Sequence, residues 1–170
     1  MNYSRNDLIS ADATMNQLRN AVYHLARLMG KNKISDVKSR FRRMGENIAK
    51  TYVDYWKPKD MVNRANLRET IGMIYKEILK SSVAVEINKT DQLIVVKDTG
   101  CALCKYDYDD IHIAGCEILL GLVSTFVNEI NRLSGQKAYL VLEPVRVQES
   151  KALGNEKCVQ VFKYKAGGLA

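Results

Sequence analysis

The chain has 170 residues, of which 46% are hydrophobic and 26% charged, a composition that suits a single globular domain with a core of its own. No run approaches the roughly 18 apolar residues of a membrane span, and the N-terminus lacks a secretory signal pattern, so we expect a soluble cytoplasmic protein. The net charge of +7 is concentrated in residues 1–60, which contain 12 Lys or Arg and 6 Asp or Glu residues. Nucleic-acid binding through this basic part is therefore one alternative.

Apolar residues at helical spacing predict three helices in the first half of the chain. The first extends over about 11–29, and Gly30 offers its C-terminal stop. The second follows Ser35 as its N-cap and is closed by Pro58, and the third lies near 65–81. The apolar positions behind these predictions are Leu18, Val22, Leu25 and Met29; Val37, Phe41, Met44, Ile48, Tyr52 and Tyr55; and Leu67, Ile71, Ile74 and Ile78.

The apolar period changes to that of strands after the third predicted helix. β-branched runs at 83–87 and 92–97, separated by four polar residues, predict a β-hairpin. Two further strands are expected at about 138–149 and 157–164, joined by a turn around Gly154.

The segment of about 109–134 predicts a long helix with Asp109 or Asp110 as its N-cap. Because this helix is apolar on nearly every side, we expect it to be buried at the centre of the domain. N-terminal helices, two hairpins and a buried central helix together predict an α+β domain with an antiparallel sheet.

The four cysteines, Cys101, Cys104, Cys116 and Cys158, admit three interpretations: disulfides, a metal site, or small apolar residues of the core. A cytoplasmic chain disfavours disulfides. The C-x-x-C pair follows a predicted strand, but residues 105–108 separate it from the next helix. A redox pair needs a helix N-terminus to lower the pKa of one thiol, so this separation counts against a thioredoxin-like site.

A metal site needs the four sulfurs to converge. The two-residue gap between Cys101 and Cys104 lets both thiolates reach one ion at about 2.3 Å. Cys116 lies at the central helix and Cys158 at the start of the last strand, so a single sheet packed on that helix would bring all four together. Thiolate ligands favour zinc, with iron as an alternative. His112 is the reserve ligand, although a hydrogen-bonded histidine near a helix start is the simpler interpretation.

Aromatic and basic residues gather on the second predicted helix. Tyr52, Tyr55 and Trp56 could line a ligand pocket, or they could belong to the core. Four basic residues flank the apolar seam of this helix, which favours a solvated face over a nucleic-acid site. These residues are Lys38, Arg40, Arg42 and Arg43.

Catalytic motifs are not evident. The sequence has no P-loop, no G-x-G-x-x-G and no G-x-S-x-G, and it has only two histidines. A zinc ion with four protein ligands would also leave no position for a catalytic water. We therefore expect a non-catalytic protein.

Roughly residues 40–164 resemble the 4-vinyl reductase (hydrocarbon-binding) domain family. The resemblance is carried by C-A-L-C at 101–104, by Gly115-Cys116 with Gly121 leading an apolar helix, and by E-S-K-A-L-G-N-E-K-C-V-Q-V-F at 149–162. Cysteines of this pattern bind zinc in the family, which implies Cys101, Cys104, Cys116 and Cys158 here. The departure is Ser150, where the family has a further cysteine.

The resemblance also implies a fold and a ligand. The family's fold is similar to that of the small subunits of the TRAPP vesicle-tethering complex, which dimerise through N-terminal helices. We accordingly expect residues 1–35 to form a dimerisation helix, 36–165 to bind a small hydrophobic molecule in an apolar cavity, and 166–170 to form a frayed tail. A homodimeric ligand-binding protein is the leading hypothesis, and a TRAPP-like interaction scaffold without ligand is the alternative.

Overall fold

The structure is a computed structural model that describes residues 4–136 and 138–168. Its elements in chain order are α1 (Arg5–Lys31), α2 (Val37–Tyr52), α3 (Leu67–Glu77), β1 (Val83–Asn88), β2 (Leu93–Asp98), α4 (Glu117–Leu133), β3 (Ala138–Glu149), the 3-10 turn η1 (Lys151–Leu153) and β4 (Cys158–Gly168). The predicted α+β class is confirmed. No helix among the described residues is long and apolar enough to cross a membrane.

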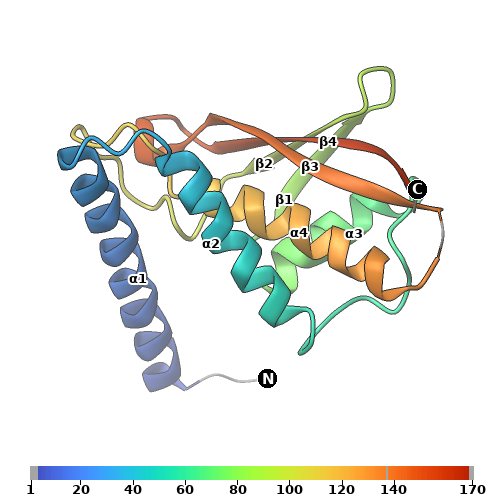
Figure 1. Ribbon diagram of the computed structural model, residues 1–170. Coiled ribbons are helices and arrows are strands. Elements are labelled where there is room, and N and C mark those ends of the chain that lie inside the picture. The colour runs from blue at the N-terminus through green and yellow to red at the C-terminus, as the bar shows by residue number, and fades with distance from the viewer. Residues whose placement is uncertain (1–3, 137, 169–170) are drawn as a thin grey trace.

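The four strands form one antiparallel sheet in the order β1-β2-β4-β3 (Figure 1). The hairpins are formed by β1 with β2 and by β3 with β4. Strand β2 pairs with β4 in a register that sets Ile94 opposite Phe162 and Asp98 opposite Cys158. The alternation along β2 buries Ile94, Val96 and Asp98 on the inner face. The two predicted hairpins therefore share one sheet, as the convergence of the cysteines requires.

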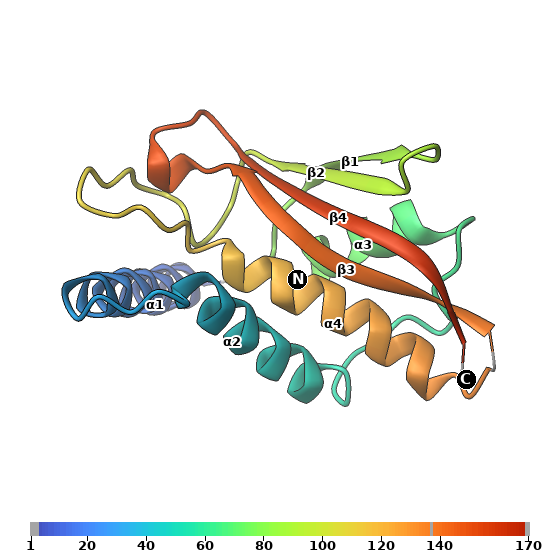
Figure 2. The same cartoon turned by 45° about the horizontal axis from the view of Figure 1, so that its top comes forward.

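The buried helix α4 lies beneath this sheet, and α2 packs against α4 on the side away from the strands (Figure 2). Glycines allow the two helices to approach closely. A Cβ atom at Gly45 would lie 1.9 Å from the carbonyl oxygen of Ile118, and one at Gly121 would lie 2.0 Å from that of Arg42. The Arg42 guanidinium also bonds Glu117 at 2.7 Å, so this basic residue joins α2 to the start of α4.

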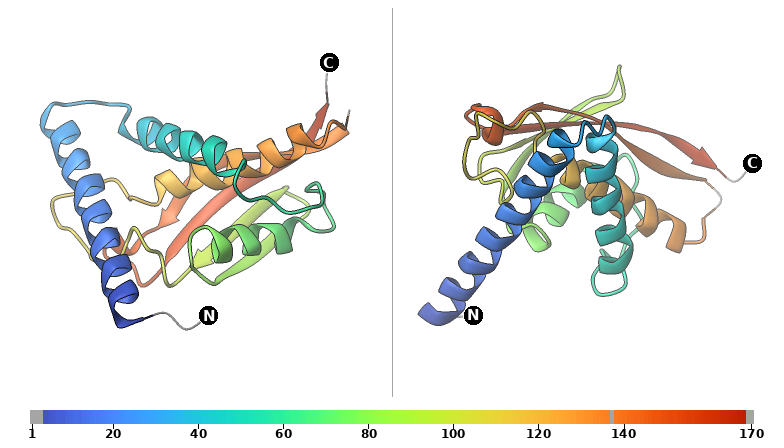
Figure 3. Two further views of the ribbon diagram at one scale, coloured as in Figure 1. Left: turned by 90° about the horizontal axis from the view of Figure 1, so that it is seen from below. Right: turned by 60° about the vertical axis from the view of Figure 1, so that its left-hand side comes forward.

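Helix α1 projects at an angle from the rest of the domain (Figure 3). Its buried residues belong to a core cluster different from the one between the sheet, α3 and α4. This second cluster, called here the cysteine core, comprises Val22, Tyr23, Ala26, Met29, Val37, Phe41, Cys101, Leu103, Cys104, Ile111, Ala114, Cys116, Ile118, Leu119, Ala152 and Cys158.

Several predicted boundaries are wrong, among them the closure of the second helix by Pro58, since α2 ends at Tyr52. Helix α4 begins at Glu117 with Cys116 as its N-cap, and not at Asp109 or Asp110. Residues 109–116 instead form a loop, because Ile111 and Ala114 are buried in the cysteine core, and that packing overrides local helix propensity.

Two more corrections concern the start of α2 and the end of β4. The N-cap of α2 is Asp36 rather than Ser35. Residues 166–168 of the expected tail extend β4 and pair with β3, while 169–170 lie outside the described residues.

Candidate metal centre and apolar cavity

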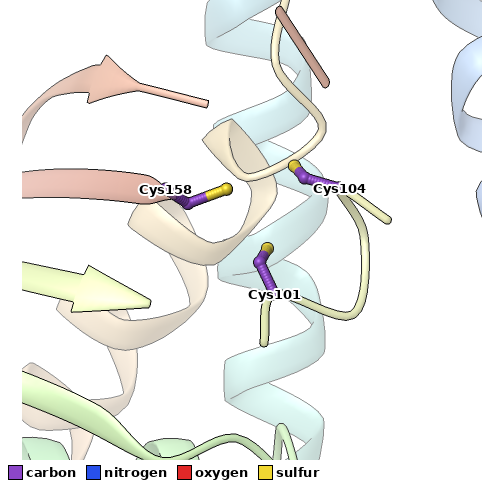
Figure 4. Close-up of side chains that lie close together, drawn as sticks. All are labelled: Cys101, Cys104 and Cys158. Carbon is purple, nitrogen blue, oxygen red and sulfur yellow. The ribbon is translucent and has the colours of Figure 1, made fainter. Parts of the chain in front are cut away.

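The four cysteines come from three separate parts of the fold. Cys101 and Cys104 lie in the loop after β2, Cys116 caps α4, and Cys158 is the first residue of β4. All four are buried and reduced. The sulfur atoms of Cys101, Cys104 and Cys158 lie within 4.8 Å of one another (Figure 4).

Local backbone geometry explains this convergence. The amide of Cys104 donates a 3.2 Å hydrogen bond to the carbonyl of Cys101, which folds the C-x-x-C segment into a turn. Cys158 stands opposite Asp98 in the β2–β4 register, at the end of β2 from which this loop departs. The strand pairing therefore sets the third sulfur beside the first two.

Ser150 contacts three of the four cysteines and links Cys116 to the others. Its hydroxyl is 3.5 Å from the sulfur of Cys104, 3.8 Å from that of Cys116 and 3.9 Å from that of Cys158. Ser150 is fully buried, and its hydroxyl also accepts a hydrogen bond from the amide of Ala152. Cys116 thus faces the same hydroxyl as Cys104 and Cys158, although it lies outside the compact group of three.

The thiols interact strongly with one another. Hydrogen bonding from Cys101 lowers the pKa of both Cys104 and Cys158. Hydrogen bonding within the cluster raises the pKa of Cys101 and Cys116. A buried group of thiols cannot carry four negative charges without a cation, and a divalent metal ion is the cation that thiolates of this spacing bind. Cys101, Cys104 and Cys158 lie close enough to one another to hold such an ion, and a set of thiolate donors is one that suits zinc.

Helix α1 supplies contacts to the cluster that the sequence analysis missed. The hydroxyl of Tyr23 donates to the sulfur of Cys104 at 3.4 Å and accepts from the amide of Gly115 at 3.3 Å. Arg19 is buried and donates from its Nε to the carbonyl of Ala102 at 2.5 Å. Tyr23 is adjacent to the predicted stripe residue Val22, but nothing in the local sequence indicates a partner 81 positions away.

The reserve ligand His112 is exposed in the loop before α4 and is not part of the cysteine cluster. Residues 109–116 are not helical, so His112 does not lie on the helix that was predicted to begin at Asp109 or Asp110.

An apolar cavity of about 520 Å³ lies between α1, α2, α4 and the loop after β2. This volume falls in the usual range of small-molecule sites. Its lining residues are Asp12, Met15, Leu18, Val22, Met44, Ile48, Tyr52, Ile78, Leu79, Lys80, Ser81, Asp98, Gly100, Ala102, Leu103, Ile118, Leu119 and Leu122.

The three aromatic residues predicted for a pocket take different positions. Tyr52, at the end of α2, lines the cavity. Tyr55 is 81% exposed. Trp56 stacks on Phe126 with ring centroids 5.8 Å apart, against the core between the sheet and α4. Neither Tyr55 nor Trp56 is among the cavity residues.

One buried acid interrupts the apolar lining. Asp98 is 1% exposed, and its Oδ1 accepts hydrogen bonds from the Ser81 hydroxyl at 2.6 Å and the Gly100 amide at 2.9 Å. Its Oδ2 has no hydrogen-bond partner among the described residues. Burial raises the pKa of this carboxyl group.

Comparisons with known proteins establish the fold alone. No family model matches the chain, and no curated protein matches it. A trafficking protein particle complex subunit 3 from Naegleria fowleri, covalently bound to palmitic acid, has a similar structure with a TM-score of 0.68 and 13% identity. That match covers 93% of this chain and 98% of the other.

A second similar structure is the phenol-responsive sensory domain of the transcription activator PoxR with phenol. Its TM-score is 0.51 at 13% identity, and the match covers 85% of this chain and 73% of the other. The TRAPP-like part of the predicted fold is thus confirmed, and neither description names a catalysed reaction.

Proposed function

We propose that the chain is a non-catalytic binding protein for a small hydrophobic molecule, organised by a zinc ion on Cys101, Cys104, Cys116 and Cys158. The observation that carries the proposal is the position of the apolar cavity beside the cluster. Ala102 and Leu103, the two residues between the first two cysteines, are themselves cavity wall.

The metal would act as a structural element. Four thiolates fill a tetrahedral zinc ion and leave no position for a reacting water. Because metal binding and folding are coupled when the ligands come from separate segments, zinc would fix the C-x-x-C loop against α4 and β4. It would thereby fix one wall of the cavity.

The similar structures support a hydrophobic ligand. One is described with palmitic acid and the other with phenol. In this chain all four cysteines belong to the buried cluster, and none of them lines the cavity. We therefore propose reversible, non-covalent binding.

Elemental analysis of protein purified without a metal-affinity tag tests the metal, with one zinc per chain as the expected result. Cys158→Ser should lose zinc and melt at a lower temperature, whereas Ser150→Ala, which alters the neighbouring hydroxyl and leaves every sulfur, should retain zinc. Native mass spectrometry of the same sample should reveal small apolar molecules that copurify. Metal-free protein with four titratable thiols would contradict the zinc site.

A second candidate function is an interaction scaffold of the TRAPP-subunit kind. Apolar side chains remain exposed on α1 and α2, among them Ile9, Leu18 and Leu28 on α1 and Ile48 on α2. Such residues suit the predicted homodimer, in which residues 1–35 provide the contact. Light scattering of wild type and of Leu28→Glu measures the oligomeric state. Leu28 is chosen because it is exposed and does not line the cavity. A dimer that the substitution dissociates, with no copurifying ligand, would favour the scaffold.

A further inference from the structure

Arg19 of α1 is a buried cation without an acid beside it. The residue is 6% exposed and is the sole Lys or Arg among the buried residues that the structure describes. Its guanidinium donates from Nε to the carbonyl of Ala102 and from Nη1 to Oδ1 of Asn16, and both acceptors are neutral. No ion pair within the described part of the chain includes Arg19. A buried charge is costly unless an opposite charge lies near it, so this guanidinium needs an anionic partner.

The contact made by Arg19 lies inside the C-x-x-C turn. Ala102 stands between Cys101 and Cys104, and the amide of Cys104 bonds the carbonyl of Cys101. On α1, Arg19 and Tyr23 are four residues apart, so they share one face of the helix. The hydroxyl of Tyr23 is 3.4 Å from the sulfur of Cys104. One face of α1 therefore contacts the turn through both residues.

The proposed metal centre has the charge that Arg19 lacks. A zinc ion with four thiolate ligands keeps a net charge of about −2, because four negative charges surround two positive ones. The buried carboxyl groups of the described residues, Asp98 and Glu117, have other partners. Glu117 pairs with Arg42 at 2.7 Å, and Asp98 accepts hydrogen bonds from Ser81 and Gly100.

We propose that Arg19 is the counter-charge of the metal centre: its guanidinium offsets the excess negative charge of the thiolates and thereby raises the affinity for zinc. This proposal rests on the zinc site proposed above. Arg19 is not a ligand, and it acts from α1 across the Ala102 carbonyl. Because α1 brings this charge to the cluster, the docking of α1 and the binding of zinc should favour each other.

Competition with a chelator measures the zinc affinity of wild type, Arg19→Lys and Arg19→Gln. Both new side chains can donate a hydrogen bond to the Ala102 carbonyl, and of the two only Lys keeps the positive charge. Arg19→Gln should bind zinc roughly tenfold more weakly, the usual scale for loss of a group that supports metal ligands. Arg19→Lys should stay closer to wild type than to Arg19→Gln.

The matched control is Arg27→Gln, which removes the same charge from α1 at an exposed position paired with Asp110. Solvent screens that charge, so the zinc affinity should not change. The proposal is overturned if Arg19→Gln binds zinc as tightly as wild type. It is also overturned if Arg19→Lys loses as much affinity as Arg19→Gln, because hydrogen-bond geometry and not charge would then matter.

The test does not depend on Arg19→Gln alone. If that variant fails to fold, Arg19→Lys decides, since a tenfold loss of affinity in the variant that keeps the charge also overturns the proposal. Wild type that binds no zinc would instead refute the zinc site itself.

Discussion

The two core clusters of this domain are stabilised in different ways. The cluster between the sheet, α3 and α4 consists almost entirely of large apolar side chains such as Ile94, Phe126 and Phe162, each fully buried. The cysteine core contains four thiols and several loop residues, and α1 is joined to it by polar contacts from Arg19 and Tyr23. Burial of apolar area dominates the first cluster, whereas the proposed metal ion would add to the stability of the second.

This difference bears on function because the cavity lies at the boundary between the two clusters. Leu122 of α4 belongs to the first cluster, and Val22 and Leu103 belong to the cysteine core, and all three line the cavity. One wall is thus built on the apolar core between the sheet, α3 and α4. The opposite wall is built on a loop and a helix that the proposed metal would hold.

Metal removal should produce the largest loss of stability. That loss should be confined to the cysteine core. After treatment with a chelator, backbone amides of α1 and residues 99–116 should exchange with deuterium much faster, because the proposed zinc ion would contribute directly to the stability of its ligand loops. Amides of α4 beyond its first turn should keep their protection against exchange. The same holds for amides of β4 beyond its first residue. Hydrogen exchange with mass spectrometry measures both, and equal loss of protection in both clusters would contradict the division.

The glycine contact between α2 and α4 should show the second-largest effect. Gly121→Ala would place a methyl group 2.0 Å from the carbonyl oxygen of Arg42, so the free energy of unfolding should fall by about 3 kcal/mol. Gly72→Ala is the matched control in α3, where a Cβ atom would meet nothing within 4 Å. The control should be neutral or stabilising by about 0.5–1 kcal/mol, as expected for Gly to Ala in a helix.

Urea denaturation of wild type and both variants gives these values. Similar stabilities for Gly121→Ala and Gly72→Ala would show that the two helices can separate without cost, which contradicts the close approach.

The first cluster is also the part that could be predicted from the sequence. The body of α4 is apolar on nearly every side, and the strands carry β-branched runs, so local periodicity identified them. The start of α4 could not be found in this way, because burial of Ile111 and Ala114 against the cysteine core keeps residues 109–116 out of the helix. Periodicity measures a segment's own preference and not the packing that overrides it.

The site was predictable to a similar degree. The C-x-x-C motif and the shared sheet brought Cys101, Cys104 and Cys158 together, as the structure places them. Asp98 was missed, although the alternation of Ile94, Val96 and Asp98 along one strand puts this acid on the buried face. An acid in the apolar phase of a strand is a signal that sequence reading can use.

Tyr23→Phe should have a smaller effect, limited to the cysteine core. The substitution removes the donor to Cys104 and leaves the buried amide of Gly115 without its acceptor, which should cost roughly 1–2 kcal/mol. Tyr108→Phe is the control, because its ring packs on that of Tyr23 with centroids 4.4 Å apart and its hydroxyl makes no hydrogen bond to the described cysteines. In thermal unfolding of zinc-loaded protein, Tyr23→Phe should melt at a lower temperature than Tyr108→Phe. Equal melting temperatures would mean that the Tyr23 hydroxyl does not stabilise the cysteine cluster.

Loss of the exposed contact between α1 and the loop before α4 should have the smallest effect on stability. Arg27 bonds Asp110 through two hydrogen bonds, at 2.5 and 3.0 Å, and this hydrogen bonding lowers the pKa of Asp110. The lowered pKa means that the contact stabilises the fold at neutral pH and is lost as the pH falls through the folded-state value. Water and salt screen such a pair, so Asp110→Asn should scarcely change the melting temperature at pH 7, and less still at high salt. A large decrease at low salt that shrinks as salt is added would mean that α1 is held by surface charge rather than by Tyr23, Arg19 and the proposed metal.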